Sequence, residues 1–76
     1  MAKKVRHPDI QAWAEGSIAL LQPQNEAGIA WVNENIGKDN GYQPYWPTVL
    51  CEPRYAADIT ESMEADGLMV GYGSPR

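Results

Sequence analysis

The residues best suited to recognition chemistry gather in one loop. Tyr42, Tyr45 and Trp46 lie among Gly and Pro residues in the stretch 37–47. Prolines stiffen such a loop, and Tyr and Trp supply a large contact area at low side-chain entropy cost. This composition favours an interaction surface. The alternative is that the three rings fold back over the sheet and complete the core, because the chain contains no Phe.

A second candidate site follows the short apolar run that precedes Glu52 in the sequence. Arg54 and Tyr55 stand directly after the expected end of a strand, and loops at the carboxyl ends of strands often hold ligands. These two residues therefore indicate a small-molecule site. The alternative is a solvated Arg and a packed Tyr at the start of a helix.

A third candidate is an acidic helix face. The helical spacing places Asp58, Glu61 and Glu64 on the outward side of a helix that begins at Pro53. The chain has ten Asp and Glu and six Lys and Arg, and residues 1–8 hold three of those bases and no acid. The remaining residues are therefore strongly acidic, which disfavours phosphate contacts with nucleic acid. Mimicry of nucleic-acid charge is a further hypothesis, and it requires one continuous acidic patch.

Side chains for catalysis or metal binding are scarce. The only cysteine is Cys51 and the only histidine is His7, so no internal disulfide and no zinc cluster are expected. Cys51 lies in an apolar run and is interpreted as a small buried thiol rather than a nucleophile. Neither a catalytic set, nor a metal, nor a cofactor is predicted.

The elements that position these residues follow from periodicity and punctuation. Residues 10–21 predict a β-hairpin closed at Glu15-Gly16, with a short helix over 10–15 as the alternative. Asn25 and Gly37 bound a helix. Residues 48–51 predict a strand, residues 53–66 a second helix ended by Gly67, and residues 68–72 a last strand.

The order strand, helix, strand, helix, strand predicts an α+β (α/β-like) fold. Both helices are expected in crossover positions on one face of a three- to four-stranded sheet, which makes a two-layer sandwich. The expected organisation is a flexible basic tail at 1–8, a single domain at 9–72 and a frayed end at 73–76. The thin aliphatic core and the open sheet face also predict a homodimer.

No apolar run approaches the ~20 residues of a membrane helix, and no export signal is recognised near the start. We therefore expect a cytoplasmic protein without a membrane partner.

The stretch Cys51-Glu52-Pro53-Arg54-Tyr55 through Asp66-Gly67-Leu68-Met69-Val70 resembles a group of short, uncharacterised bacterial proteins. Residues 27–35 are similar to the first helix of that group, and the resemblance covers roughly residues 18–70. Such proteins are often encoded on prophages, plasmids or other mobile elements, and no activity is attached to them. The resemblance implies the same fold and a cytoplasmic location.

These observations predict a small, non-enzymatic accessory protein. Its expected partner is another macromolecule, most simply a protein, bound through the aromatic loop and the acidic helix face. The alternatives are a small-molecule site near Arg54 and Tyr55 and an acidic nucleic-acid mimic.

Overall fold

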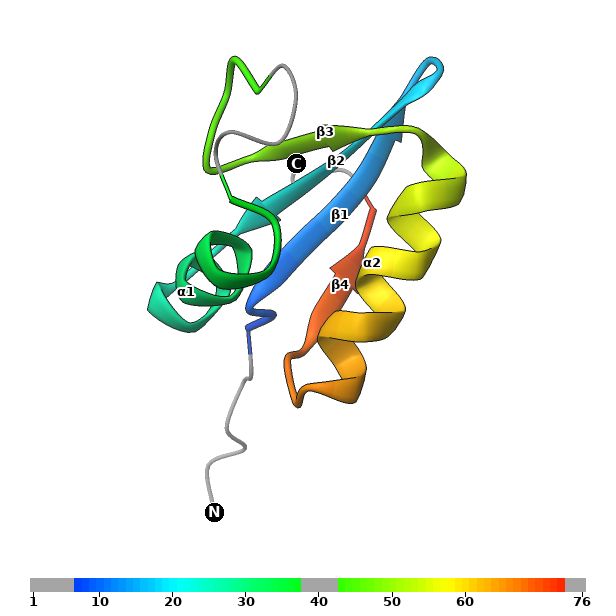
Figure 1. The fold of residues 1–76 in the computed structure, drawn as a ribbon. Helices are drawn as coiled ribbons and strands as arrows, with labels where there is room; N and C mark the ends of the chain where they lie inside the picture. Colours follow the sequence, from blue (N-terminus) through cyan, green and yellow to red (C-terminus); the bar gives the residue numbers. More distant parts are fainter. Residues whose placement is uncertain (1–6, 38–42, 74–76) are drawn as a thin grey trace.

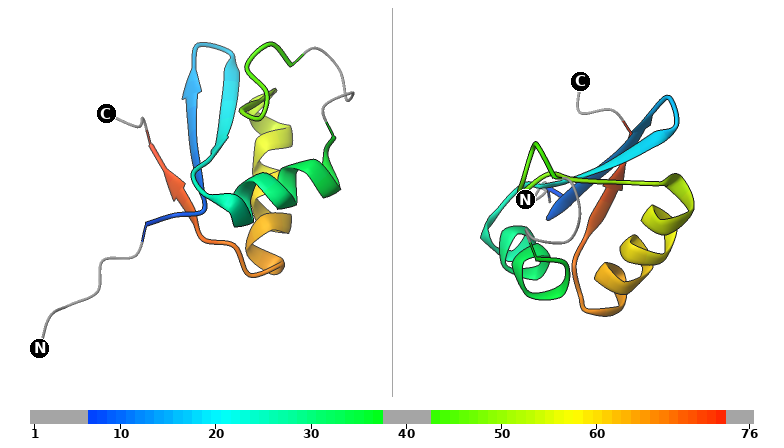
Figure 2. Two further views of the ribbon diagram at one scale, coloured as in Figure 1. Left: turned by 90° about the vertical axis from the view of Figure 1, so that its left-hand side faces the viewer. Right: turned by 45° about the horizontal axis from the view of Figure 1, so that its top comes forward.

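The computed structural model describes residues 7–37 and 43–73. They form β1 (Ile10–Glu15), β2 (Ile18–Pro23), α1 (Glu26–Asn35), β3 (Val49–Cys51), α2 (Pro53–Ala65) and β4 (Val70–Tyr72) (Figure 1). The four strands make one mixed sheet in the order β3-β2-β1-β4. Both helices lie on the same side of this sheet (Figure 2). The predicted α+β class is confirmed.

The hairpin prediction is confirmed and the alternative of a helix over 10–15 is wrong. Alternating side chains explain this, because β1 is buried at every second residue near its start. The predicted turn position is one residue early: Glu15 pairs with Ile18, so the loop is Gly16-Ser17. Gly16 has φ +63°, a left-handed conformation that glycine adopts without a steric penalty.

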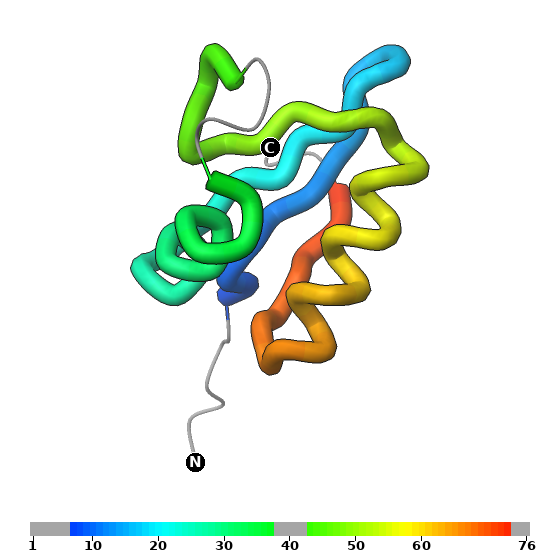
Figure 3. Tube along the Cα trace, viewed as in Figure 1, coloured from blue at the N-terminus to red at the C-terminus, as the bar shows by residue number. Residues whose placement is uncertain are grey.

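The predicted order of strands and helices is only partly correct. The hairpin contributes two strands before α1, and α1 then joins β2 to β3, which are antiparallel neighbours. Only α2 is a crossover helix, since it joins β3 to β4 at the two edges of the sheet (Figure 3). The strand directions explain this order. β2 is antiparallel to both β1 and β3, so β3 runs parallel to β1 and to β4, and only the connection from β3 to β4 joins parallel strands.

The core lies between the sheet and the helices. Strand register places alternate residues on the helix side. The core cluster of buried residues consists of Ile10, Ala12, Leu21, Val32, Val49 and Met63. The other side of the sheet carries Trp13, Leu20 and Leu50 in one row across three strands. No helix of the described ranges covers this second face (Figure 2).

The start and end of α1 agree with the sequence signals. The Asn25 side chain accepts a hydrogen bond from the Gly28 N–H at 2.9 Å, and Gly37 follows the helix with φ +80°. Val32 is fully buried on the inner side of this helix, whereas Ile29 is 39% exposed. Gly28 takes the inward position where α1 approaches the chain before β1.

Asn25→Ala is expected to destabilise the protein by about 0.5–2 kcal/mol, because it removes the cap of α1. The loss should be near the top of that range, since the Asn25 amide also donates to the Asp9 carboxylate at 2.7 Å. Asn33→Ala, at an exposed position of the same helix, is the control and should cost little. Urea unfolding of the two variants measures both, and equal losses would contradict the capping role.

No helix within residues 7–37 and 43–73 combines the length and the apolar character that crossing a membrane requires.

Candidate functional site

The aromatic loop is divided between core and surface. Trp46 is half-buried and packs against the core cluster, whereas Tyr45 is 65% exposed. The peptide bond from Trp46 to Pro47 is cis. Tyr42 lies outside the described residues. Trp46 therefore follows the core interpretation of this loop and Tyr45 the surface interpretation.

Arg54 and Tyr55 lie in the first turn of α2, beyond the other end of β3 from the loop (Figure 1). The guanidinium carbon of Arg54 is 5.3 Å from the centre of the Tyr55 ring, and its Nε is 3.2 Å from a Glu52 carboxylate oxygen. Tyr55 is 52% exposed rather than packed. The structure thus pairs Arg54 with Tyr55, and Tyr55 lines a hollow together with Gln43 of the loop, whereas Arg54 does not.

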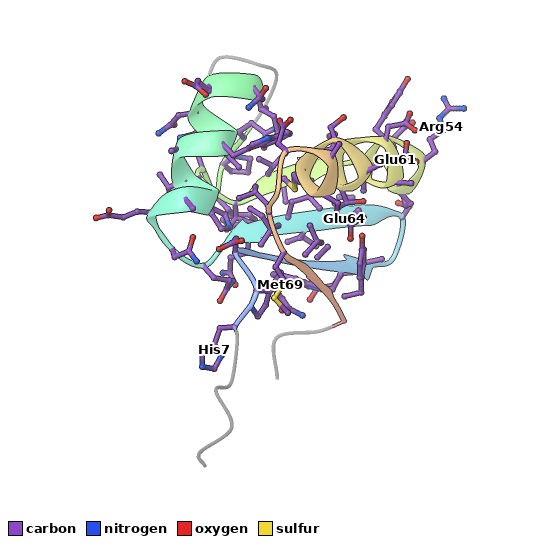
Figure 4. All side chains as sticks on the ribbon, turned by 90° about the horizontal axis from the view of Figure 1, so that it is seen from below. His7, Arg54, Glu61, Glu64 and Met69 are labelled. Carbon is purple, nitrogen blue, oxygen red and sulfur yellow. The ribbon has the colours of Figure 1, made fainter. Side chains whose placement is uncertain are left out.

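The predicted acidic face spreads over more than one side of α2. The Tyr72 hydroxyl of β4 donates to the Glu64 carboxylate at 3.3 Å, which holds Glu64 on the β4 side. Asp58 instead lines hollows between α2 and α1. Glu61 lies on the outer side of the helix with Arg54 (Figure 4). A residue advances about 100° around a helix, so two successive three-residue spacings spread the three groups over about 120°.

One of those hollows tests the small-molecule alternative. Its volume is about 430 Å³, and α1, the loop before β3, β3 and α2 line it with residues that include Gln43, Cys51 and Tyr55. Arg54 is not among the lining residues. Burial raises the pKa of the Cys51 thiol above its ordinary value, which disfavours the reactive thiolate. Cys51 has no hydrogen-bonded base in the described part of the chain.

The structure also contains an apolar cleft that the sequence patterns do not predict. It encloses about 470 Å³ between α2 and the hairpin end of the sheet. Its lining residues are Ala12, Trp13, Ala14, Ala19, Leu21, Pro53, Ala56, Ala57, Thr60, Tyr72 and Gly73. This volume lies within the range of ligand pockets, which are mostly apolar with a few polar groups at their margins.

Small side chains create this cleft. Ala14 pairs with Ala19 across the hairpin, and Ala56 and Ala57 line the cleft from α2. Methyl groups on both walls leave space that larger side chains would fill. The alanines that line the cleft are visible in the sequence, but alanine also favours helix, so their presence alone does not predict a cavity.

Two carboxylates stand near the cleft on α2. Glu61 follows the lining residue Ala57 by four positions, and Glu64 follows the lining residue Thr60 by four. Residues at that spacing share one side of a helix. Thr60 itself is satisfied, because its hydroxyl donates to the Ala57 carbonyl at 3.1 Å. Neither carboxylate lines the cleft: Glu64 is linked to it through Tyr72, and Glu61 lies next to Ala57 toward the outer side of the helix.

The charge around this site is strongly negative. Residues 7–37 and 43–73 contain nine Asp and Glu and a single Lys or Arg, Arg54. Arg54 already pairs with Glu52, and its side chain is 78% exposed. Glu61 and Glu64 form no ion pair with a cation in these ranges. The α2 surface therefore presents negative charge that a partner can neutralise.

The described ranges contain no candidate metal site, because no three His, Cys, Asp or Glu side chains are grouped there to hold an ion. Comparison with known proteins finds no family model, curated protein or solved structure that matches this chain.

Proposed function

We propose that this chain is a small, non-enzymatic binding protein whose partner is a basic, partly apolar segment of another cytoplasmic protein. The observation that carries the proposal is the apolar cleft whose lining residue Tyr72 donates to Glu64, with Glu61 three residues before Glu64 on α2. An apolar side chain of the partner enters the cleft, and Lys or Arg side chains next to it meet the two carboxylates. The aliphatic stems of Lys and Arg cover apolar surface while their charged ends stay near water.

This proposal keeps the acidic helix face of the sequence prediction and moves the apolar contact from the aromatic loop to the cleft. Trp46 packs in the core, and Tyr45 is separated from the cleft by β3. Whole-surface mimicry of nucleic acid is less well supported, because the carboxylates are divided among β1, α1, α2 and their connections. Local docking requires only the group on α2.

The test is binding of synthetic peptides that vary charge and apolarity independently. A fluorescent peptide that repeats Lys-Lys-Val-Val is expected to bind, because an extended chain of this pattern carries both Lys and Val on each of its faces. Its affinity should fall as salt rises because the attraction is screened. Peptides with Glu in place of Lys, or Ser in place of Val, should bind much more weakly. Fluorescence anisotropy at several salt concentrations measures all three.

A pair of double variants localises the binding. Glu61→Gln/Glu64→Gln removes two carboxylates beside the cleft, and exposed charge pairs contribute about 0.2–1 kcal/mol each. The affinity should therefore fall about two- to thirtyfold. Glu26→Gln/Glu34→Gln removes the same charge from α1 and is the control. Equal losses in the two double variants would show non-specific attraction and reject this site.

A further inference from the structure

The two edge strands of the sheet, β3 and β4, differ in whether their outward backbone groups are hydrogen-bonded. At the β3 edge, the Gln43 side chain bonds both backbone groups of Leu50: its Oε1 accepts from the Leu50 N–H at 2.9 Å, and its Nε2 donates to the Leu50 carbonyl at 3.3 Å. The amide of Gln43 thus takes the place of a neighbouring strand. Exposed strand edges are templates for pairing with other chains, and this contact closes the β3 edge at its middle residue.

The β4 edge has no such cover in the described residues. Ile10 N–H donates to the Met69 carbonyl at 3.2 Å, and Gly73 N–H donates to the Ala12 carbonyl at 2.7 Å. In a parallel ladder, alternate residues direct their backbone groups to one neighbour. Residues 69, 71 and 73 therefore face β1. The N–H and carbonyl groups of Val70 and Tyr72 face away from the sheet.

The surroundings of this edge match the cleft already described. Tyr72 lines the cleft and is 64% exposed, and its hydroxyl reaches Glu64 of α2. Figure 2 shows that α2 lies on the same side of the sheet as α1 and that β4 is an edge strand. A strand added to β4 would direct every second side chain toward the α2 side. These side chains would meet the apolar lining of the cleft and the carboxylates of Glu61 and Glu64.

We propose that the partner segment docks as an added strand on β4, with basic side chains directed toward Glu61 and Glu64. The inference rests on the proposed binding function and names its mode, in which backbone hydrogen bonds supply affinity and side chains supply selectivity. Charge selects the occupant. A second copy of this chain would bring another acidic α2 surface to the same edge, whereas a basic strand neutralises it.

Amide hydrogen exchange followed by NMR tests the mode with the Lys-Lys-Val-Val peptide as the probe. On binding, exchange at the Val70 and Tyr72 amides should slow at least tenfold, while exchange at Leu50, already bonded to Gln43, should be unchanged. Binding without protection at Val70 and Tyr72 would overturn strand addition and leave the proposed function intact. Absence of binding by any basic peptide would overturn both.

A matched pair of variants isolates the backbone bond. Tyr72→Pro removes an outward N–H without touching the β1 ladder, and proline is tolerated at such edge positions. Tyr72→Thr removes the same ring but keeps the N–H. Strand addition predicts at least tenfold weaker binding for the Pro variant than for the Thr variant. Equal affinities would reject it, and if the Pro variant does not fold, the exchange measurement on the wild-type protein decides.

The other occupants are also distinguishable. Protection of Val70 and Tyr72 in the absence of peptide, appearing only with a concentration-dependent dimer in sedimentation, would replace the basic strand by a second copy. The same protection in a monomer, lost on deletion of residues 1–6, would assign the edge to the chain's own basic segment, which contains Lys3, Lys4 and Arg6. Either result would overturn the proposal.

Discussion

Met63→Ala is expected to lower the free energy of unfolding by about 2–5 kcal/mol. Met63 has no exposed surface and packs where α2 meets the central strands. Truncation removes buried apolar atoms and leaves a cavity that a well-packed interior only partly refills. A protein of this length has a total stability of roughly 4–11 kcal/mol, so a large share of the molecules should unfold at moderate temperature.

Met69→Ala is the matched control for this prediction. The same side chain is removed, but Met69 is 36% exposed and contributes chiefly its backbone bonds to Asp9 and Ile10. Its expected cost is below about 1 kcal/mol, as for most surface substitutions. Urea titrations of both variants give the comparison. Equal losses of unfolding free energy in the two variants would contradict the packing of α2 on the sheet through Met63.

Gly28→Ala is expected to destabilise the protein by about 1–3 kcal/mol, although local propensity predicts the opposite sign. Alanine in place of glycine within a helix usually adds up to about 1 kcal/mol of stability. Here the new methyl group would meet the backbone carbonyl oxygen of Asp9, together with Ile10 Cδ1 and Pro23 Cβ, each at 3.1 Å. Backbone cannot move aside as a flexible side chain can, so overpacking dominates.

Ala30→Gly calibrates that result within the same helix. Ala30 is exposed on α1, so its replacement should cost about 1 kcal/mol from propensity alone. A loss for both substitutions, which are opposite in chemistry, is the signature of a steric limit at position 28. A gain in stability for Gly28→Ala, measured by thermal and urea unfolding, would show that α1 does not approach Asp9 this closely.

Parts of the candidate site were accessible from sequence and parts were not. Arg54, Tyr55 and the acidic residues of α2 were placed on the correct helix, because the Pro53 start and the Gly67 stop are local signals. The side of α2 that each carboxylate occupies was not accessible. It depends on which stripe of the helix packs on the sheet, and Glu64 is oriented by Tyr72, a residue from a different element.

The division of the aromatic loop is a second example. Tyr45 and Trp46 are neighbours of similar type, and both interpretations of the loop were consistent with its composition. Trp46 is half-buried because its ring packs against the core cluster just before β3 begins, while Tyr45 is exposed to solvent. Neighbouring residues often face opposite ways, and no local pattern states which of two rings turns inward.

The amino-acid sequence by itself determined the local elements: the hairpin around Gly16, the helix capped by Asn25, the helix that starts at Pro53, and a body that is acidic overall. These follow from propensities, caps and charges that act over a few residues. Tertiary structure alone decided the strand order, the Ala-lined cleft and the contrast between the edge closed by Gln43 and the open β4 edge. Each of these depends on residues far apart in the chain meeting in space.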